Sequence, residues 1–234
     1  MSEQIKETIV MSVGGSLIVP DHIDTTFLKN LHTFITEQTT KHGRRFIIIA
    51  GGGRTARRYQ DAAREVADLE AEDLDWMGIH ATRLNGHLLR TIFRDIAHRV
   101  MVTNPDDVLD AQKDAPLIIA AGYRPGASTD LRAVQIAARV GAKKVINLSN
   151  TDYIYSANPN DNPDATKFED ITWVEFRKLI PAEWDPGLSS PFDPVAAREA
   201  EGLALEVASI NGSELTQLAN YLDNKKFVGT KIHI

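Results

Sequence analysis

Two runs of consecutive glycines, each directly after an apolar stretch, constrain the fold of this chain more than any other feature. Ile9–Val13 leads into Gly14 and Gly15, and Phe46–Ala50 leads into Gly51–Gly53. A strand that ends at glycines lets backbone N–H groups approach a ligand with no Cβ in the way, and a following helix points its positive end at the same place. Both turns therefore favour an anion, most simply a phosphate, at the end of a strand.

Positive charge accompanies only the second turn. Arg54, Arg57 and Arg58 follow Gly53 directly. A single glycine pair after a strand is more often an ordinary tight turn, but its recurrence together with three arginines favours a phosphate site. We expect Arg54 and Arg58 to face solvent or to pair with nearby acidic residues.

Composition limits the possible partners. With 234 residues, 43% of them hydrophobic, the chain can bury the core of one large α/β domain. Its net charge of −6 argues against a dedicated nucleic-acid-binding protein. The absence of cysteine excludes disulfides, zinc–thiolate sites and thiol catalysis. No apolar run approaches the roughly 20 residues of a membrane span, so we expect a cytoplasmic protein with no nucleic-acid or membrane partner.

Short apolar runs alternate with longer amphipathic segments, which is typical of parallel strands joined by crossover helices. The expected strands are Ile9–Val13, Phe46–Ala50, Val100–Thr103, Leu117–Ala121, Lys144–Leu148, Leu205–Ile210 and Val228–Ile232. The expected helices are Thr25–Thr39, Arg54–Leu69, Trp76–His98, Asp130–Arg139 and Pro194–Leu203.

One segment is dominated by turn-forming residues. Asn158–Asp164 is rich in Asn, Asp and Pro, and we expect an internal loop or hairpin there rather than a flexible linker. The whole chain, 1–234, is therefore predicted to be one domain with two lobes, 1–145 and 146–234.

Two other kinds of site, a dinucleotide site and a histidine metal site, fit the sequence less well. Gly51–Ala56 fits the dinucleotide fingerprint GxGxxA, but no second strand ending in an acidic residue follows about 20 residues later, so a dehydrogenase is disfavoured. His80 and His87 lie seven residues apart, whereas helical metal ligands are usually closer and have further ligands. No metal-ligating side chains are predicted.

Six motifs occur in an order that resembles the amino acid kinase family, most closely its archaeal-type UMP kinase branch. These motifs are Val13–Pro20, Gly51–Arg57, Asp75–Ile79 with Thr82–Asn85, Pro125–Asp130, Asn150–Pro159 and Asp193–Ala197. The resemblance extends from about residue 9 to Gly229 and Thr230.

The resemblance implies a three-layer αβα sandwich around a mainly parallel sheet of about eight strands. It also implies transfer of the γ-phosphoryl group of ATP to UMP, which gives UDP and ADP, with Mg²⁺ bridging the phosphates. The first lobe would bind the monophosphate acceptor and the second lobe ATP. Family members often assemble as homo-oligomers, and a hexamer is implied here.

The resemblance assigns three groups of site residues. The acceptor would be bound by Gly51, Gly52, Gly53, Arg57, Asp75, Tyr123, Ser128 and Thr129. ATP would be bound by Gly14, Gly15, Ser16, Asn150, Asp152, Tyr155, Asn158 and Pro159. The catalytic positions would be Asp130, Asp193 and Ser12.

The chain departs from the family pattern at several of these positions. Ser12 stands where many family members have a lysine that stabilises the transferred phosphoryl group. Lys143, Lys144, Arg198 and Mg²⁺ are candidates for the missing charge. Tyr123, with Arg124 and Ala127, changes the acceptor loop, and Tyr153 replaces a usual glycine in the ATP segment.

These departures leave two alternatives to a UMP kinase. One is a non-catalytic nucleotide or oxyanion binding or storage protein with the same fold. The other is a family kinase for a different small phosphate or carboxylate acceptor.

Overall fold

A seven-stranded sheet forms the centre of the computed structural model, which describes residues 5–159, 161–183 and 190–234. Its strand order is β3-β2-β1-β4-β8-β9-β7, and only the β8–β9 pair is antiparallel. The strands are β1 (Glu7–Val13), β2 (Arg44–Ala50), β3 (Leu117–Ala120), β4 (Lys144–Ser149), β7 (Asp170–Thr172), β8 (Glu206–Asn211) and β9 (Thr230–His233). The expectation of an α/β fold with a mainly parallel sheet is confirmed.

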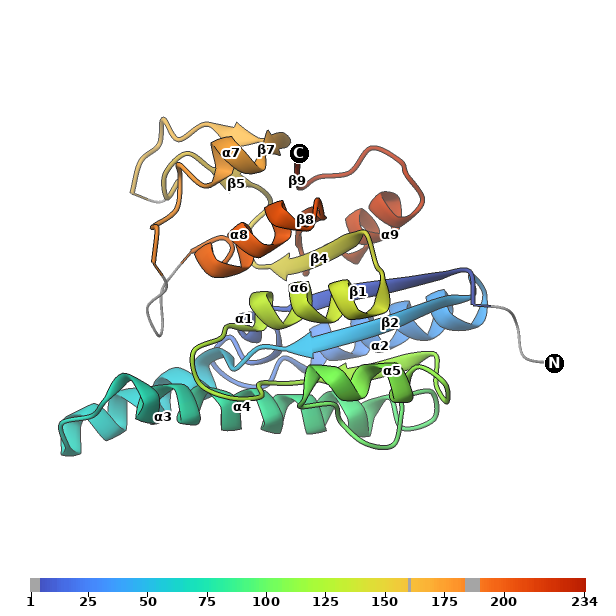
Figure 1. Ribbon diagram of the computed structural model, residues 1–234, viewed down its shortest axis with the longest axis horizontal. Coiled ribbons are helices and arrows are strands. Elements are labelled where there is room, and N and C mark those ends of the chain that lie inside the picture. The colour runs from blue at the N-terminus through green and yellow to red at the C-terminus, as the bar shows by residue number, and fades with distance from the viewer. Residues whose placement is uncertain (1–4, 160, 184–189) are drawn as a thin grey trace.

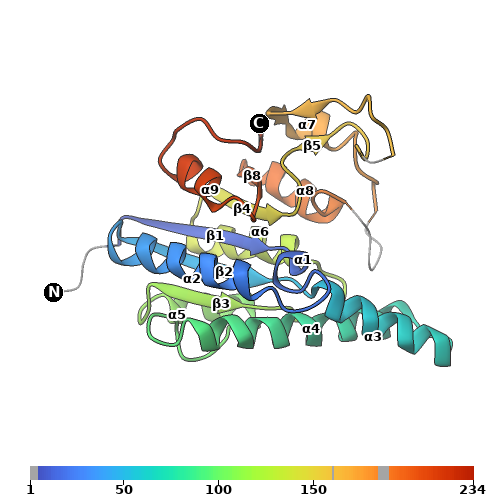
Figure 2. The same cartoon turned by 180° about the vertical axis from the view of Figure 1, so that it is seen from behind.

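Helices cover both faces of this sheet, which makes three layers. One face carries α2 (Thr25–Thr40), α4 (Ala71–Ile92) and α9 (Leu215–Leu222), and the other carries α6 (Thr129–Val140) and α8 (Pro194–Gly202) (Figures 1 and 2). The remaining helices are α1 (Gly15–Ile18), α3 (Gly53–Val66), η1 (Pro105–Asp107), α5 (Val108–Ala111) and α7 (Trp173–Phe176). Figure 1 shows α3 and the start of α4 projecting beyond the end of the sheet. Among the described residues, no helix combines the length and the apolar character needed to cross a bilayer.

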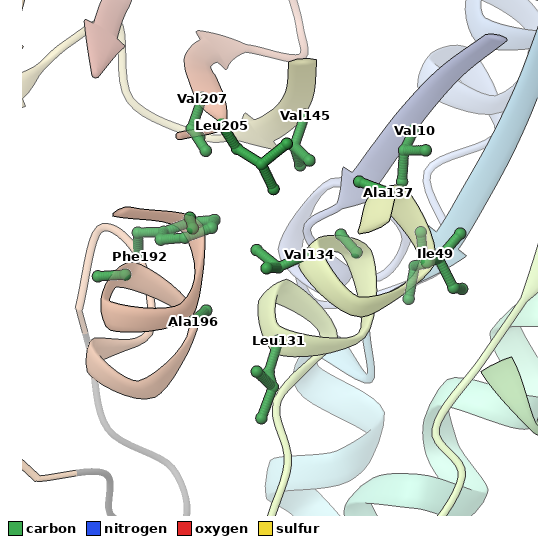
Figure 3. Close-up of a cluster of buried hydrophobic side chains, with 14 of the residues drawn as sticks. Val10, Ile49, Leu131, Val134, Ala137, Val145, Phe192, Ala196, Leu205 and Val207 are labelled. Atoms are coloured by element: carbon green, nitrogen blue, oxygen red, sulfur yellow. The ribbon is translucent and has the colours of Figure 1, made fainter. Parts of the chain in front are cut away.

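Side chains alternate between the two faces along β1, as the pleat of a strand requires. Ile9, Met11 and Val13 belong to the hydrophobic cluster under α2 and α4, whereas Val10 belongs to the cluster under α6. Figure 3 shows Val10 beside Ala137 of α6. Ser12 is two residues after Val10, so its side chain points to the α6 face as well. A polar side chain is thereby placed in an otherwise apolar layer.

Local signals fix the two helices that matter most for the packing of β1. Asp24 caps α2, since its side chain accepts hydrogen bonds from the backbone N–H groups of Thr26 and Phe27 at 2.9 Å. Ser128 caps α6 in the same way, and Gly141 ends it with φ +69°, a left-handed conformation that glycine adopts at no steric cost. Both helices agree with the predicted ranges within one residue at each end.

Two other helices differ from the prediction at their ends. Helix α4 begins at Ala71 rather than Trp76, because Glu70 and Asp73 form a capping box. It also ends at Ile92 rather than His98. Helix α3 ends at Val66, three residues before the predicted end at Leu69.

The predicted strand Val100–Thr103 is not formed as such. Only Val102 pairs with β3, through an isolated bridge to Ala120, while Val100 is exposed. The reason is the early start of η1, where Asn104 accepts a hydrogen bond from the N–H of Asp106 and turns the chain away from the sheet edge. The central sheet still has seven strands, because β7, at its edge, was not among the expected strands.

The turn-rich segment Asn158–Asp164 lies between two short strands. β5 (Ile154–Tyr155) and β6 (Lys167–Phe168) pair antiparallel, so the predicted hairpin is confirmed. Residue 160, within this segment, lies outside the described residues.

The two glycine turns meet at the carboxyl ends of β1 and β2. A Cβ atom built on Gly15 would lie 1.9 Å from the backbone N of Gly53 and 2.7 Å from the carbonyl C of Gly51. Gly53 has φ +61°, and a Cβ there would lie 2.2 Å from the carbonyl oxygen of Gly15. Only glycine permits this approach of two backbones. The two predicted phosphate turns are therefore one continuous surface.

Because of this contact, adding a single methyl group at Gly15 should strongly destabilise the folded state. Gly15→Ala should lower the free energy of unfolding by more than about 2 kcal/mol, because the backbones must separate. Chemical denaturation measures this. Gly202→Ala is the matched control: no atom lies within 4 Å of a Cβ built there, so its effect should stay below about 1 kcal/mol. Equal stability of the two variants would contradict the contact.

Candidate active site

Ser12, Asp130 and Asp193 meet at the carboxyl end of β1, although the sequence separates them widely. The hydroxyl of Ser12 donates to Oδ1 of Asp130 at 3.0 Å, and the backbone N–H of Asp193 donates to Oδ2 of Asp130 at 3.3 Å. Asp193 is also the N-cap of α8, since its Oδ1 accepts from the N–H of Ala196 at 2.7 Å. The fold therefore joins the ends of β1, α6 and α8 through one carboxylate.

The ionised form of Asp130 is unfavourable in this position. Ser12 and Asp193 are buried, and Asp130, though partly accessible, is closely surrounded by protein. Desolvation raises the pKa of Asp130 to about 6, and the nearby Asp193 carboxylate adds to the rise. The hydrogen bonds from Ser12 and Asp193 favour the charged form and offset part of it. Such a carboxyl group is typical of functional sites.

Asn147 fixes the segment that carries Asp193. It lies opposite Ser12 in the parallel β1–β4 register, and it is buried. Its side-chain amide donates to the carbonyl oxygen of Pro191 at 2.8 Å, two residues before Asp193. Without this donor, the carbonyl oxygen of Pro191 would lose the side-chain partner that holds it to β4.

Some backbone N–H groups of the glycine turns are used within the fold and others are free. Gly14 donates to Leu148 at 2.8 Å, and Gly51 donates to Val13 at 2.9 Å. In the described part of the chain, the N–H groups of Gly15 and Ser16, and those of Gly52 and Gly53, have no hydrogen-bond acceptor. Four donors are thus available to an anion at the place where the turns meet.

A residue of α4 binds the backbone of the second glycine turn. Asn85 is buried, and its amide donates to the carbonyl oxygens of Gly51 and Gly52 at 2.8 and 3.2 Å. Asn85 thereby fixes the conformation of the turn, while the N–H groups of Gly52 and Gly53 have no acceptor within the described residues.

The three arginines after this turn behave differently. Arg58 forms an ion pair with Asp21, as predicted for an arginine near an acid. Arg54 and Arg57 are exposed, and neither guanidinium has an ion pair or hydrogen bond within the described residues. Both are therefore free to bind an anion.

Helix α4 also holds the predicted acceptor loop through its backbone. Asp75 accepts from the N–H of Gly126 at 2.8 Å, and desolvation raises the pKa of this carboxyl group. Arg83 donates to the carbonyl oxygens of Gly122 and Tyr123 at 3.0 and 2.9 Å. The hydroxyl of Thr82 accepts from the N–H of Gly122 at 2.9 Å. One helix therefore sets the distance between this loop and the second glycine turn.

Positive charge surrounds the aromatic residue of this loop. The guanidinium carbons of Arg124 and Arg132 lie 5.7 and 5.5 Å from the ring centroid of Tyr123, within cation–π range. Ser128 caps α6 by accepting from the N–H of Leu131 at 3.1 Å, and Thr129 is the first residue of that helix. The predicted acceptor residues thus lie on α4, on this loop and at the start of α6.

The predicted ATP residues follow β4. Asn150 is exposed, and Asp152 accepts from the side-chain amide of Asn211, at the end of β8, at 2.7 Å. Tyr155 lies in β5 with its ring edge-on to Tyr153. Asn158 donates to Asp161, and Pro159 is exposed in the same hairpin. Their binding of ATP stays a prediction.

Protein side chains alone do not form a metal site here, so a metal ion would also need oxygen atoms from a bound substrate. Within the described ranges, no three His, Cys, Asp or Glu side chains lie close enough together to hold one. Asp130 and Asp193 are two neighbouring carboxylates beside the free N–H groups of the turns. Mg²⁺ is commonly held by one or two carboxylates together with substrate phosphates, so this donor set fits such an ion.

Comparison with known proteins identifies the family. The model of the amino acid kinase family matches residues 7–208. This chain belongs to the amino acid kinase family. Among related members, uridylate kinase from Methanospirillum hungatei is 34% identical over 226 residues, which are 96% of this chain and 94% of that protein. Uridylate kinase from Methanosarcina barkeri is 32% identical over 93% of this chain and 92% of that protein.

Solved structures show the same fold. Uridylate kinase from Archaeoglobus fulgidus has a TM-score of 0.79 and 24% identity, over 97% of this chain and 99% of that chain. UMP kinase from Bacillus anthracis has a TM-score of 0.76 and 15% identity, over 99% of this chain and 97% of that chain. The predicted membership of the amino acid kinase family and its archaeal-type branch is confirmed.

Two positioning residues of this family member were not among the predicted site residues. Asn85 and Asn147 both bind backbone carbonyl oxygens at the site. Asn147 had a detectable signal, since it interrupts the apolar run Val145–Leu148. Asn85 lies in the motif Thr82–Asn85, but its contact with the glycine turn was not predicted, because a polar residue in an amphipathic helix is usually on its solvent side.

The raised pKa of Asp130 predicts a pH-dependent cost in stability. Because its pKa is higher in the folded state than the ordinary value of 3.8, stability from this group is greatest at low pH and falls as the pH rises from about 4 to above 6. Relative to Asp130→Asn, the wild-type free energy of unfolding should drop by about 2 kcal/mol between pH 4.5 and 8. Urea unfolding of both proteins measures it. Parallel pH curves would show that Asp130 is not desolvated.

Proposed function

We propose that this protein is a nucleoside monophosphate kinase that transfers the γ-phosphoryl group of ATP to UMP, giving UDP and ADP. The observation that carries the proposal is the contact between the glycine turns, which brings together N–H groups of both turns that have no acceptor within the described residues. Two phosphate sites that share a border allow in-line transfer between two nucleotides. The relatives named uridylate kinase support UMP as the acceptor.

The acceptor would lie on the side of β2 and α4. Gly52 and Gly53 would donate to its phosphate, with Arg57 as the cation. Asp75 would accept from the ribose hydroxyls, which suits a carboxylate that has one oxygen on Gly126 and a second oxygen to offer. Tyr123 and Thr129 would line the rest of this site.

ATP would lie on the side of β4 and β8. Gly15 and Ser16 offer N–H groups to its phosphates, and the segment from Asn150 to Pro159 would contact the nucleoside. Mg²⁺ would be held by the phosphates with Asp130 and Asp193. The ion would neutralise charge on the transferred group.

No general base is needed for this reaction. The acceptor is a phosphate monoester with a second pKa near 6, so an attacking oxygen is already ionised at neutral pH. The protein must instead align the two phosphates and reduce their mutual repulsion. Ser12 and Asp193 hold Asp130 by both of its oxygens, which fixes the end of this site.

Further features stay predictions. The hexamer rests on the resemblance alone, and sedimentation would test it. The division into an acceptor lobe, 1–145, and an ATP lobe, 146–234, is proposed on the same ground, and the lobes share one sheet through the β1–β4 pair. A cytoplasmic location rests on the cysteine-free composition.

The first test is an acceptor panel with Mg-ATP. We expect UMP to give UDP and ADP at least about 10-fold faster than CMP, AMP or GMP. Asp193→Asn should lower turnover, because the ionised carboxylate would be lost. Product from a different phosphate or carboxylate acceptor alone would identify another kinase of the family. ATP binding with no product from any acceptor would identify a non-catalytic binding protein.

Replacing Arg57 tests the acceptor side separately. Arg57→Ala should raise the KM for UMP by about 10- to 100-fold, because a charge-assisted hydrogen bond to phosphate is lost, and should change the KM for ATP little. Steady-state kinetics with each substrate varied in turn measure this. Arg64→Ala, which removes a surface arginine paired with Asp61, is the control. An unchanged KM for UMP would remove Arg57 from the site.

A further inference from the structure

The proposed reaction leaves a charge unaccounted for. Two phosphate groups would meet beside Ser12, where many family members have a lysine. The two lysine candidates, Lys143 and Lys144, cannot supply this positive charge. Lys144 begins β4, and the site lies at the other end of that strand. Six residues at about 3.3 Å each separate the two ends by more than the length of a lysine side chain. Lys143 precedes Lys144 and lies farther still.

The third candidate is occupied elsewhere. The guanidinium of Arg198, in the middle of α8, donates to the carbonyl oxygen of Ala182. Besides Mg²⁺, a protein cation for this place must therefore come from another element of the site.

Arg54 lies where the two glycine turns meet. It follows Gly53, whose backbone touches Gly15, and its own N–H donates to the carbonyl oxygen of Val19 at 3.1 Å. Val19 comes directly after α1, the short helix that begins at Gly15. Arg54 thus follows the second turn in the sequence, and its backbone contacts the segment that follows the first turn.

The helix geometry of α3 directs this side chain to the first turn. Arg58 lies one turn later on the same face, and it reaches Asp21. That face therefore looks toward residues 19–21, whereas Ala56 and Gln60 are buried on another face. Side chains on a helix lean toward its N-terminus, so Arg54 leans toward the glycines and away from Arg58.

We propose that Arg54 is a catalytic residue that contacts the transferred phosphoryl group and replaces the charge of the missing lysine. The inference rests on the proposed kinase function. A bond forms between a phosphate oxygen of the acceptor and the γ-phosphorus, and the bond from that phosphorus to the β–γ bridging oxygen breaks, with its electron pair leaving on ADP. Arg54 neutralises charge on the non-bridging oxygens, and no proton moves. Its guanidinium is exposed and has no partner among the described residues.

Three variants test this role. Arg54→Met should lower kcat for UDP formation by about 100-fold and change the KM for UMP less than about 3-fold, since the charge acts on the transition state. Arg54→Lys should recover at least a tenth of the wild-type kcat, as a charge does and a packing contact does not. Arg58→Met, which removes the neighbouring arginine, should match wild type. Wild-type kcat in Arg54→Met, or a loss seen only in the KM for UMP, would overturn the proposal.

Two further measurements separate this inference from the proposed function. Added guanidinium ion should raise the activity of Arg54→Ala and leave Arg57→Ala unchanged. By calorimetry, wild type should bind Mg-ATP more tightly than Mg-ADP, and Arg54→Met should lose most of that difference. The calorimetric comparison needs no turnover: if wild type makes no product, the kinase proposal fails and this readout still decides whether Arg54 contacts the γ-phosphate. An unchanged preference for ATP would refute the contact.

Discussion

The contact between the backbones of Gly15 and Gly53 is the constraint on which the site depends. It exists because β1 and β2 are adjacent parallel strands in register, so their carboxyl ends reach the same edge of the sheet. Each strand then ends at glycines, which lets the two turns touch without a Cβ between them. N–H groups that belong to separate motifs are thereby brought close together. A larger residue at either turn would move the two turns apart.

Both acidic and basic side chains lie at the carboxyl edge of the sheet. The pKa of Asp130 is raised because a buried carboxylate loses water and faces a second carboxylate, and hydrogen bonds from Ser12 and Asp193 restore only part of the difference. Such a site favours a bound cation, which fits a reaction between two anions. Helix α3 supplies Arg54 and Arg57, which are exposed and have no acidic partner within the described residues.

Helix α4 relates the acceptor loop to the second glycine turn. Its side chains bind backbone groups at both places: Asn85 holds Gly51 and Gly52, and Arg83 holds Gly122 and Tyr123. Backbone contacts of this kind fix where a loop lies and leave its side chains free to vary. This explains how the loop can differ from the family pattern at Tyr123 and still be held in place.

The sequence by itself determined the elements and the chemistry of their ends. The apolar runs before glycine predicted β1 and β2, the helical spacing of apolar residues predicted α2 and α6, and the ordered motifs indicated the family, because each of these signals is local in the sequence. Val100–Thr103 shows where such local reasoning fails, since strand formation there depended on a helix that starts just beyond it. Only the tertiary structure decided that Ser12 meets Asp130 and Asp193, that Asn147 holds the Asp193 segment, and that the backbone of Arg54 contacts Val19. These pairs are distant in the chain, and it is the register of neighbouring strands and the packing of α3, α6 and α8 on the sheet that bring them together.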